Sequence, residues 1–281
     1  MVGFLYAEQY SSAMQHSKKA LFSTSTTPRL MLDVDVSQNA IVTLNPDQSH
    51  YIARVMRLKA GDTLRIFNGH VGEWLARIET SSKNALTLVC MQQLQPQHDA
   101  PDLMVCFAPP RGGRLETILE KATELGARTI QPIKTERTIV ASLNETRAKT
   151  LLREAAEQCE RLDVPELYPM VSLATLIKGW QPSRHLFYGD ETGASSPMTT
   201  NSLGNLPANG VDNAQNCFGI LAGPEGGFTP EELAALRAMP QAKGVSLGPR
   251  ILRVDTAVIT LTALCQHYWG DWHILPRFTG E

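Results

Sequence analysis

LAGPEGGFTPEE, residues 221–232, joins an apolar strand to a helix and is the densest signal in the sequence. The apolar run that ends at Ala222 is typical of a buried strand. Thr229 and Glu232 form the S/T-x-x-E pattern of a helix capping box. Pro230 stands at the first helical position, where its missing N–H costs nothing. The glycines between the two elements let the backbone approach a ligand closely and present its amide groups to it.

A glycine-rich turn of this kind serves either as a simple structural turn or as a ligand loop. Neither the G-x-x-x-x-G-K-[ST] spacing nor the G-x-G-x-x-G spacing of nucleotide-binding loops is present. A bound nucleotide phosphate is therefore the weaker of the ligand interpretations.

A second stretch, LGPRILRVDTA at residues 247–257, again reads as a strand end, a turn and a helix start. It places Arg250 and Arg253 at the carboxyl end of a strand, where open α/β sheets bind their ligands. The alternative is that the two arginines pair with acidic side chains on the surface.

Strands and helices alternate around these two stretches. We expect strands at 103–108, 129–133, 167–171, 185–189, 218–222 and 245–248, and helices at 114–125 and 144–161 and from residues 230 and 256 onward. This alternation predicts a largely parallel sheet that is covered by helices on both faces. Residues 191–216 lack periodicity and are rich in Ser, Thr, Asn, Gly and Pro, which predicts a long surface loop.

The amino-terminal third has a different pattern. Short strands at 40–44, 63–67, 71–78 and 85–90, with one helix that starts after residues 45–47, predict a small β-barrel. Asn68-Gly69 indicates a type I′ hairpin turn. Arg54 and Arg57 lie three apart and would project from the same side of the helix, either as a phosphate clamp or as a solvated face. The polar segment 93–101, with two prolines, is typical of a linker.

Composition limits the possible functions. A chain of 281 residues is long enough for two domains, and it has no run of roughly 20 apolar residues that would span a membrane. Its five cysteines include no C-x-x-C pair, which indicates a reducing, cytoplasmic setting with cysteines as small buried side chains. The formal charge of −2 gives no global attraction to nucleic acid. The seven histidines show no metal-ligand helix spacing, so no metal site is expected.

Together with RGGRLETILEKATELG (111–126) and EQCERLDVPE (157–166), the two stretches resemble the ribosomal RNA uridine-N3 methyltransferases of the SPOUT superfamily. The resemblance spans most of residues 29–271. It implies an α/β fold with a carboxyl-terminal trefoil-knotted SPOUT methyltransferase domain with a parallel sheet at 98–281. It also implies a small PUA-like RNA-binding β-barrel at 29–97, after an extension at 1–28. That extension is read as a disordered segment or an over-extended start, with an organellar transit segment as the alternative.

The resemblance also implies partners and site residues. The expected cofactor is S-adenosyl-L-methionine, the substrate 16S ribosomal RNA in the small ribosomal subunit, and the assembly a homodimer. Residues that would line the cofactor loops are Leu221, Gly223, Pro224, Glu225, Gly226, Gly227, Leu247, Gly248, Ile251, Leu252, Arg253 and Thr256. Residues that would face RNA, or in part the dimer partner, are Arg29, Arg54, Arg57, Arg111, Arg114, Lys121 and Arg161.

Two residues depart from the family pattern. Asp255 stands where a Glu is usual, which shortens a carboxylate by one methylene, and Glu160 stands where a small residue is usual.

For the chemistry, uridine N3 must lose a proton, so we expect Arg253 to stabilise the developing oxyanion and Glu225 to be the next catalytic candidate. Two other functions stay open: a knotted methyltransferase that acts on another RNA, and a non-catalytic RNA-binding or ribosome-assembly factor.

Overall fold

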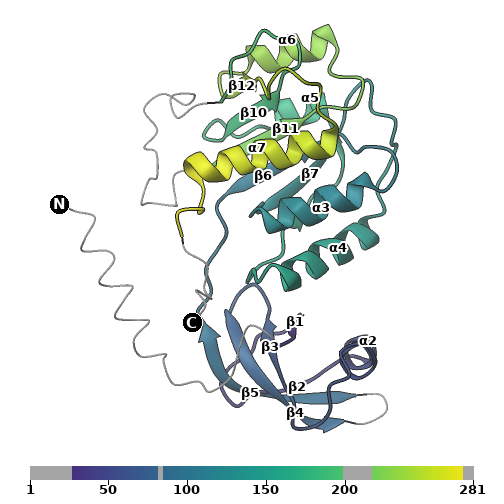
Figure 1. The fold of residues 1–281 in the computed structure, drawn as a ribbon, viewed down its shortest axis with the longest axis vertical. Coiled ribbons are helices and arrows are strands. Elements are labelled where there is room, and N and C mark those ends of the chain that lie inside the picture. Colours follow the sequence, from purple (N-terminus) through teal and green to yellow (C-terminus); the bar gives the residue numbers. More distant parts are fainter. Residues whose placement is uncertain (1–26, 82–84, 199–216, 275–281) are drawn as a thin grey trace, which may run out of the picture.

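The computed structural model describes residues 27–81, 85–198 and 217–274. Two bodies lie end to end, a curled sheet at one end and a larger α/β body at the other (Figure 1). The predictions for residues 1–26 and for most of the long loop, residues 199–216, fall outside the described residues. Among the described residues, no helix is both long and apolar enough to cross a lipid bilayer.

The smaller body is a five-stranded sheet of order β1-β3-β4-β5-β2. β1 pairs with β3 in parallel, and the other pairs are antiparallel. Its core is aliphatic and includes Ile52, Leu64, Ile66 and Leu88, all fully buried. The elements are β1 (Arg29–Met31), β2 (Ile41–Thr43), α2 (Pro46–His50), the π-helix η2 (Tyr51–Val55), β3 (Thr63–Phe67), β4 (Glu73–Ser81) and β5 (Leu86–Gln95).

Two local predictions for this body are wrong. The β3–β4 hairpin is not a two-residue type I′ turn, because Asn68 lacks a positive φ and its side chain instead accepts hydrogen bonds from the amides of His70 and Val71. The predicted helix changes to a π-helix at Tyr51, and Arg57 lies beyond it with a left-handed φ of 58°. The helical argument that places Arg54 and Arg57 on one side therefore does not apply.

The larger body confirms the parallel sheet. Its strand order is β12-β10-β11-β6-β7-β8, with β9 also on β7, and every pairing is parallel. The strands are β6 (Leu103–Phe107), β7 (Thr129–Lys134), β8 (Glu166–Leu167), β9 (Val171–Ser172), β10 (His185–Gly189), β11 (Phe218–Ala222) and β12 (Ala242–Val245). The helices are α3 (Arg114–Glu124), α4 (Glu145–Gln158), α5 (Leu173–Lys178), α6 (Pro230–Ala238) and α7 (Val254–Trp269).

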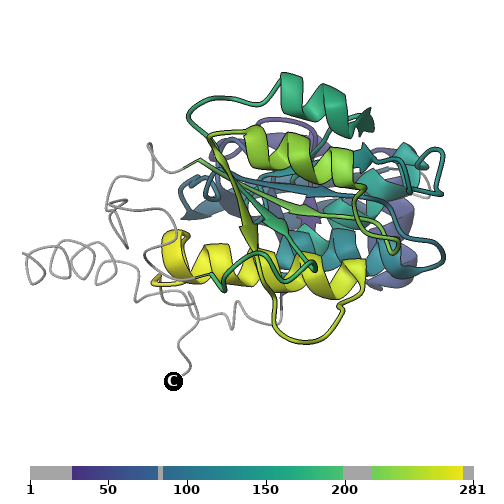
Figure 2. The same ribbon diagram turned by 90° about the horizontal axis from the view of Figure 1, so that it is seen from above.

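Helices cover both faces of this sheet, as predicted. α5 and α6 lie on one face and α7 on the other, where α3 and α4 join it (Figures 1 and 2). Alternate side chains of one strand enter the two cores: Val105 and Phe107 pack under α3 and α7, whereas Cys106 packs under α5 and α6. Of the five cysteines, Cys90, Cys106 and Cys265 are buried as predicted, and the other two are half-buried.

The differences from the predicted elements concentrate near the carboxyl edge of the sheet and at its margin. The strand expected at 167–171 is two short strands, β8 and β9, and α5 after them was not predicted. The strand expected at 245–248 is instead β12 at Ala242–Val245, residues 246–253 form a loop, and the helix expected from about residue 256 begins at Val254.

Candidate active site

Three loops follow neighbouring strands to one edge of the sheet. β10 lies between β11 and β12, and all three run in parallel. Their carboxyl ends therefore release the chain at the same edge, in the loops 190–198, 223–229 and 246–253. Both glycine-containing stretches singled out in the sequence are thus brought together.

A backbone hydrogen bond, a β-bridge and close packing join the three loops. The Ser246 amide donates to the Ser196 carbonyl at 3.1 Å, and Pro197 forms a parallel bridge with Ser246. The Glu191 carboxylate lies so close to Gly227 that a Cβ at that position would collide with it. The loop after β10 touches both of the others, and sequence analysis had not identified it as part of the site. Asp190, an acid directly after a buried strand, was the signal that could have revealed it.

Asp190 organises this first loop. It is 4% exposed and accepts hydrogen bonds from the hydroxyls of Thr192 at 2.6 Å and Ser195 at 2.7 Å, from the Thr192 amide and from Arg237 of α6. Burial by itself raises the pKa of Asp190, but these donors outweigh burial and leave its pKa below the ordinary value.

We expect Asp190→Asn to destabilise the protein by about 2 kcal/mol at neutral pH, because hydrogen bonds to a charged acceptor are lost. The lowered pKa means that the carboxylate stabilises the fold fully above its unfolded pKa of about 4 and loses this contribution as the pH falls through the folded pKa. Urea unfolding at neutral pH and at about pH 3 should therefore show the difference between wild type and variant shrinking with acid. A difference that stays constant with pH would contradict this account.

The glycine loop is shaped by close packing. Gly227 has a φ of 68°, which favours glycine, and a Cβ on Gly223 would lie 2.9 Å from the buried Phe228 ring. The predicted capping box is confirmed: Thr229 accepts from the Glu232 amide, and Glu232 accepts from the Thr229 amide. In this stretch Leu221 and Pro224 are buried, whereas Glu225 and Gly226 are exposed. Leu221 therefore supports the loop with its side chain in the core.

A fourth loop reaches the glycine loop from β7. Arg137 donates from Nη1 to the Gly226 carbonyl at 2.6 Å, and the Glu136 amide donates to the Glu232 carboxylate at 2.8 Å. Arg137 is exposed, so its guanidinium lies at the open edge. No local pattern in the sequence indicated this contact, because it joins residues 89 positions apart.

The third loop carries the predicted arginine. Arg253 is exposed and stands at the N-cap of α7, and within the described residues no hydrogen bond or ion pair occupies its side chain. Gly248 has a φ of 100° with open space around its Cβ position. Ile251 is 89% exposed, Leu252 and Leu247 are half-buried, and Thr256 is exposed. Asp255 Oδ1 is buried and has no hydrogen-bond partner among the described residues.

The residues predicted to face RNA fall into two groups. Arg111 is exposed in the loop after β6, at the same edge as the glycine loop, and Arg114 begins α3. Lys121 pairs on α3 with Glu124 at 2.8 Å and with Glu120. Arg54 and Arg57 are exposed on the smaller body.

The second group, Arg29 and Arg161, has its guanidinium groups engaged inside the protein. The prediction that Arg29 contacts RNA is therefore wrong. Its side chain is 3% exposed and its guanidinium is saturated by Glu73 and by three carbonyls of the larger body. Arg161 is similarly engaged, by Asp163 and by the carbonyls of Thr123 and Ala127. Arg29 thus joins the smaller body to the end of α4, and Arg161 joins the segment after α4 to the end of α3.

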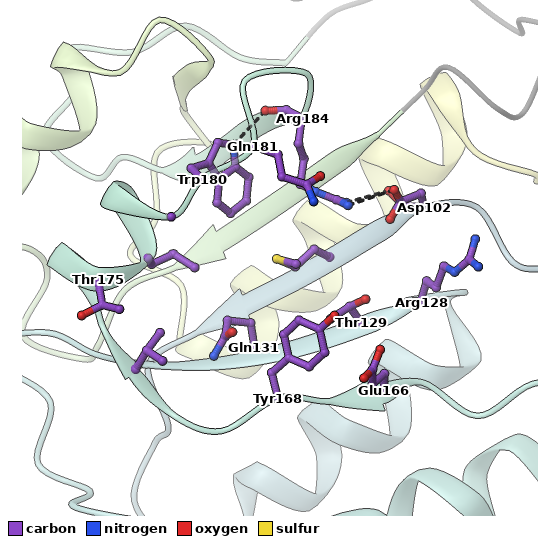
Figure 3. A pocket seen from close by; sticks show the side chains of 14 residues that line it. Asp102, Arg128, Thr129, Gln131, Glu166, Tyr168, Thr175, Trp180, Gln181 and Arg184 are labelled. Atoms are coloured by element: carbon purple, nitrogen blue, oxygen red, sulfur yellow. Dashed lines mark hydrogen bonds and ion pairs between the residues drawn. The ribbon is translucent and has the colours of Figure 1, made fainter.

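A separate cavity of about 540 Å³ lies at the opposite edge of the sheet, where β6, β7 and β10 begin. Asp102 and Arg184 face each other there at 2.9 Å, and Trp180 donates to the Arg184 carbonyl (Figure 3). None of the predicted site residues lines it. Within the described part of the chain, no cluster of three or more His, Cys, Asp or Glu residues is arranged to hold a metal ion.

Comparison with known proteins gives this architecture a family context. The family model described as RNA methyltransferase domain matches residues 98–266, and the one described as RNA methyltransferase PUA domain matches residues 44–89. The chain is 32% identical over 236 residues to ribosomal RNA small subunit methyltransferase E of Rickettsia conorii, covering 84% of this chain and 93% of the relative.

Solved structures share the fold. A ribosomal RNA small subunit methyltransferase E from Neisseria gonorrhoeae, bound to S-adenosyl methionine, superposes with a TM-score of 0.77 at 24% identity, over 88% of this chain and 99% of that one. A protein from Legionella pneumophila, described as a methyltransferase in complex with the cofactor SAM, gives 0.75 at 26% identity, over 87% and 99%.

Proposed function

Since this chain belongs to the ribosomal RNA small subunit methyltransferase E family, we propose that it transfers a methyl group from S-adenosylmethionine to N3 of one uridine in 16S ribosomal RNA. The observation that carries the proposal is the meeting of the glycine loop 223–229 and the arginine-bearing loop 246–253 at one edge of the parallel sheet. The relatives' names support RNA methylation, and the target atom is our inference.

The loops fit an adenosine-type cofactor. They present backbone rather than bulky side chains at four glycines. A Cβ would crowd neighbouring atoms at Gly223, Gly226 and Gly227, and at Gly248 it would extend into open space. Backbone N–H and C=O groups of such loops read the polar edge of a base, and half-buried Leu247 and Leu252 supply an apolar lining. Oδ1 of Asp255, which has no hydrogen-bond partner within the described part of the chain, is a further buried acceptor beside this loop. When bound, S-adenosylmethionine supplies the electrophilic methyl group.

The chain's own residues would hold and charge-balance the uridine. N3 of uridine carries a proton, and its removal puts negative charge on the base oxygens. Arg253, exposed and without an internal partner among the described residues, would stabilise that charge and orient the base. Glu225, exposed on the glycine loop, is the candidate to accept the proton. Positioning of the acceptor atom in line with the methyl group supplies much of the rate.

RNA binding would use exposed and half-buried cations of both bodies. Arg54 and Arg57 lie on the smaller body, which we propose to be a PUA-like barrel over 29–97, and Arg111, Arg114 and Lys121 lie on the methyltransferase domain over 98–281. Each phosphate contact should steepen the salt dependence of RNA affinity. We also propose a cytoplasmic homodimer with a trefoil knot around the cofactor loops. The full exposure of Ile251 at the site edge supports a second subunit covering it.

The test is methylation of small ribosomal subunits that lack the modification, with isotopically labelled S-adenosylmethionine and mass spectrometry of the digested RNA. Label in 3-methyluridine is the expected result. Cofactor binding without label in any 16S nucleoside would favour another RNA substrate. Absence of cofactor binding would favour a non-catalytic assembly factor.

A further inference from the structure

A buried cluster of charges joins the barrel to helix α4. Arg29, on the first strand of the barrel, donates from Nε to Glu73 at 2.7 Å. The other end of the same guanidinium donates to the carbonyls of Ala156, Glu157 and Arg161 at 2.8–3.0 Å. These carbonyls lie at and just beyond the carboxyl end of α4, where helix carbonyls lack partners within the helix and the helix dipole favours a cation. Arg29 therefore belongs to both bodies at once.

A second arginine repeats the connection. Arg65, on β3, pairs with Glu160 at 2.7 Å across the junction and approaches Glu73 at 3.6 Å. The side chains of Arg29, Arg65 and Glu73 are at most 3% exposed. With Glu160, whose side chain is 32% exposed, the cluster contains two positive and two negative charges, so the charges of its three buried members are balanced. We refer to Arg29, Arg65, Glu73 and Glu160 as the joint.

Glu160 has an unusual backbone in this joint. Its φ is 65°, a left-handed conformation that disfavours side chains other than Gly, Asn or Asp. A glycine there would relieve the backbone but would remove the carboxylate that holds Arg65. The strain is thus accompanied by a specific contact between the bodies.

Two polar contacts flank the joint on α4. The Met31 amide donates to the Glu157 carboxylate at 2.8 Å, and Arg153 pairs with Asp33 at 2.7 Å. α4 is the helix that faces the barrel (Figure 1). Its chain enters from the loop in which Arg137 holds the Gly226 carbonyl of the candidate active site. One helix therefore connects the barrel with the edge at which the chemistry is placed.

We propose that the joint fixes the orientation of the barrel on the methyltransferase domain and thereby positions RNA held by the barrel for methyl transfer. Glu160 and Arg65 act as positioning residues. The Arg65 side chain is 3% exposed, and Glu160, whose side chain is 32% exposed, pairs with Arg65 across the junction and not with the cofactor loops. This rests on the proposed function, because it assigns the RNA to the barrel. A preorganised barrel lowers the entropy lost when RNA engages both bodies.

Glu160→Gly in the full-length protein is the sharpest test, because it removes the ion pair while it relieves the left-handed backbone. We expect KM for unmodified small subunits to rise about tenfold, with kcat and the dissociation constant for S-adenosylmethionine within about twofold of wild type. Hydrogen exchange should accelerate at the Met31 amide, which crosses the junction. Glu160→Gln keeps the shape of the side chain and loses its charge, so its KM should lie between those of wild type and Glu160→Gly.

Asn39→Gly is the matched control. Asn39 has a φ of 64° in the barrel and is exposed away from the junction, so its replacement should leave KM and exchange at Met31 unchanged. The ion pair between Asp33 and Arg153, which flanks the joint, gives an independent check. Asp33→Arg should raise KM for the small subunits, and the double variant Asp33→Arg/Arg153→Asp should restore the wild-type KM.

Unchanged KM and unchanged hydrogen exchange at Met31 in Glu160→Gly would overturn the proposal that the joint fixes the barrel. A uniform loss of kcat and cofactor binding would also overturn it, because it would indicate general damage. Failure of the wild-type protein to methylate any RNA would overturn the proposed function instead. In that case the exchange measurement and the Asp33/Arg153 swap still decide whether the joint fixes the barrel.

Discussion

Arg253→Ala should lower kcat for RNA methylation by about two to three orders of magnitude, while S-adenosylmethionine still binds. The guanidinium is exposed at the N-cap of α7, and within the described residues it makes no hydrogen bond or ion pair, so its removal leaves the fold intact. What would be lost is the positive charge that, in the proposed mechanism, stabilises the deprotonated uracil in the transition state. Steady-state kinetics with unmodified small subunits, together with cofactor binding by calorimetry, measures both quantities.

Arg253→Lys separates charge from shape in this prediction. Lysine keeps the charge but loses the planar set of donors, so we expect it to recover only part of the activity. Arg128→Ala is a matched control, because Arg128 is an exposed arginine that pairs with Asp99 at the opposite edge of the sheet. If Arg253→Ala raised only KM and kept kcat, the arginine would bind RNA uniformly and would not act in the transition state.

Local patterns predicted most of this fold, because they report interactions between residues close in sequence. The capping box of Thr229 and Glu232 sets the start of α6, and the strands 63–67, 185–189 and 218–222 have the predicted bounds. Capping and strand alternation both act over a few residues. The resemblance added the identification of the two parts as a PUA-like domain and an RNA methyltransferase domain, which the two family models support.

Tertiary contacts could not be predicted in the same way. Arg137 reaches Gly226, and the loop after β10 reaches Gly227 and Ser246, only because β7, β10, β11 and β12 lie in an order that differs from their order in sequence. The same limit explains Arg29. A sequence shows that an arginine is present, but its burial against α4 depends on how two bodies meet.

Trp269→Ala should reduce the free energy of unfolding by about 3–5 kcal/mol, the cost of removing a large aromatic side chain from a core. Trp269 is 5% exposed at the end of α7, where its ring stacks on Phe187 at 5.0 Å and on Phe218 at 5.5 Å. These rings belong to β10 and β11, so the tryptophan anchors α7 to the strands that release two of the site loops. Trp272→Ala is the control, since Trp272 is 49% exposed and should change stability by less than about 0.5 kcal/mol.

Trp269→Phe tests which property of the side chain matters. Nε1 of Trp269 is buried without a hydrogen-bond partner among the described residues, so phenylalanine removes an unsatisfied donor while it keeps an aromatic ring against Phe187. We therefore expect Trp269→Phe to reduce the free energy of unfolding, measured with urea, by well under half of the reduction caused by Trp269→Ala. Because α7 begins directly after Arg253, the alanine variant should also weaken cofactor binding, and the phenylalanine variant should not. Equal losses for alanine and phenylalanine would contradict the account in which aromatic packing against Phe187 and Phe218 holds the helix in place.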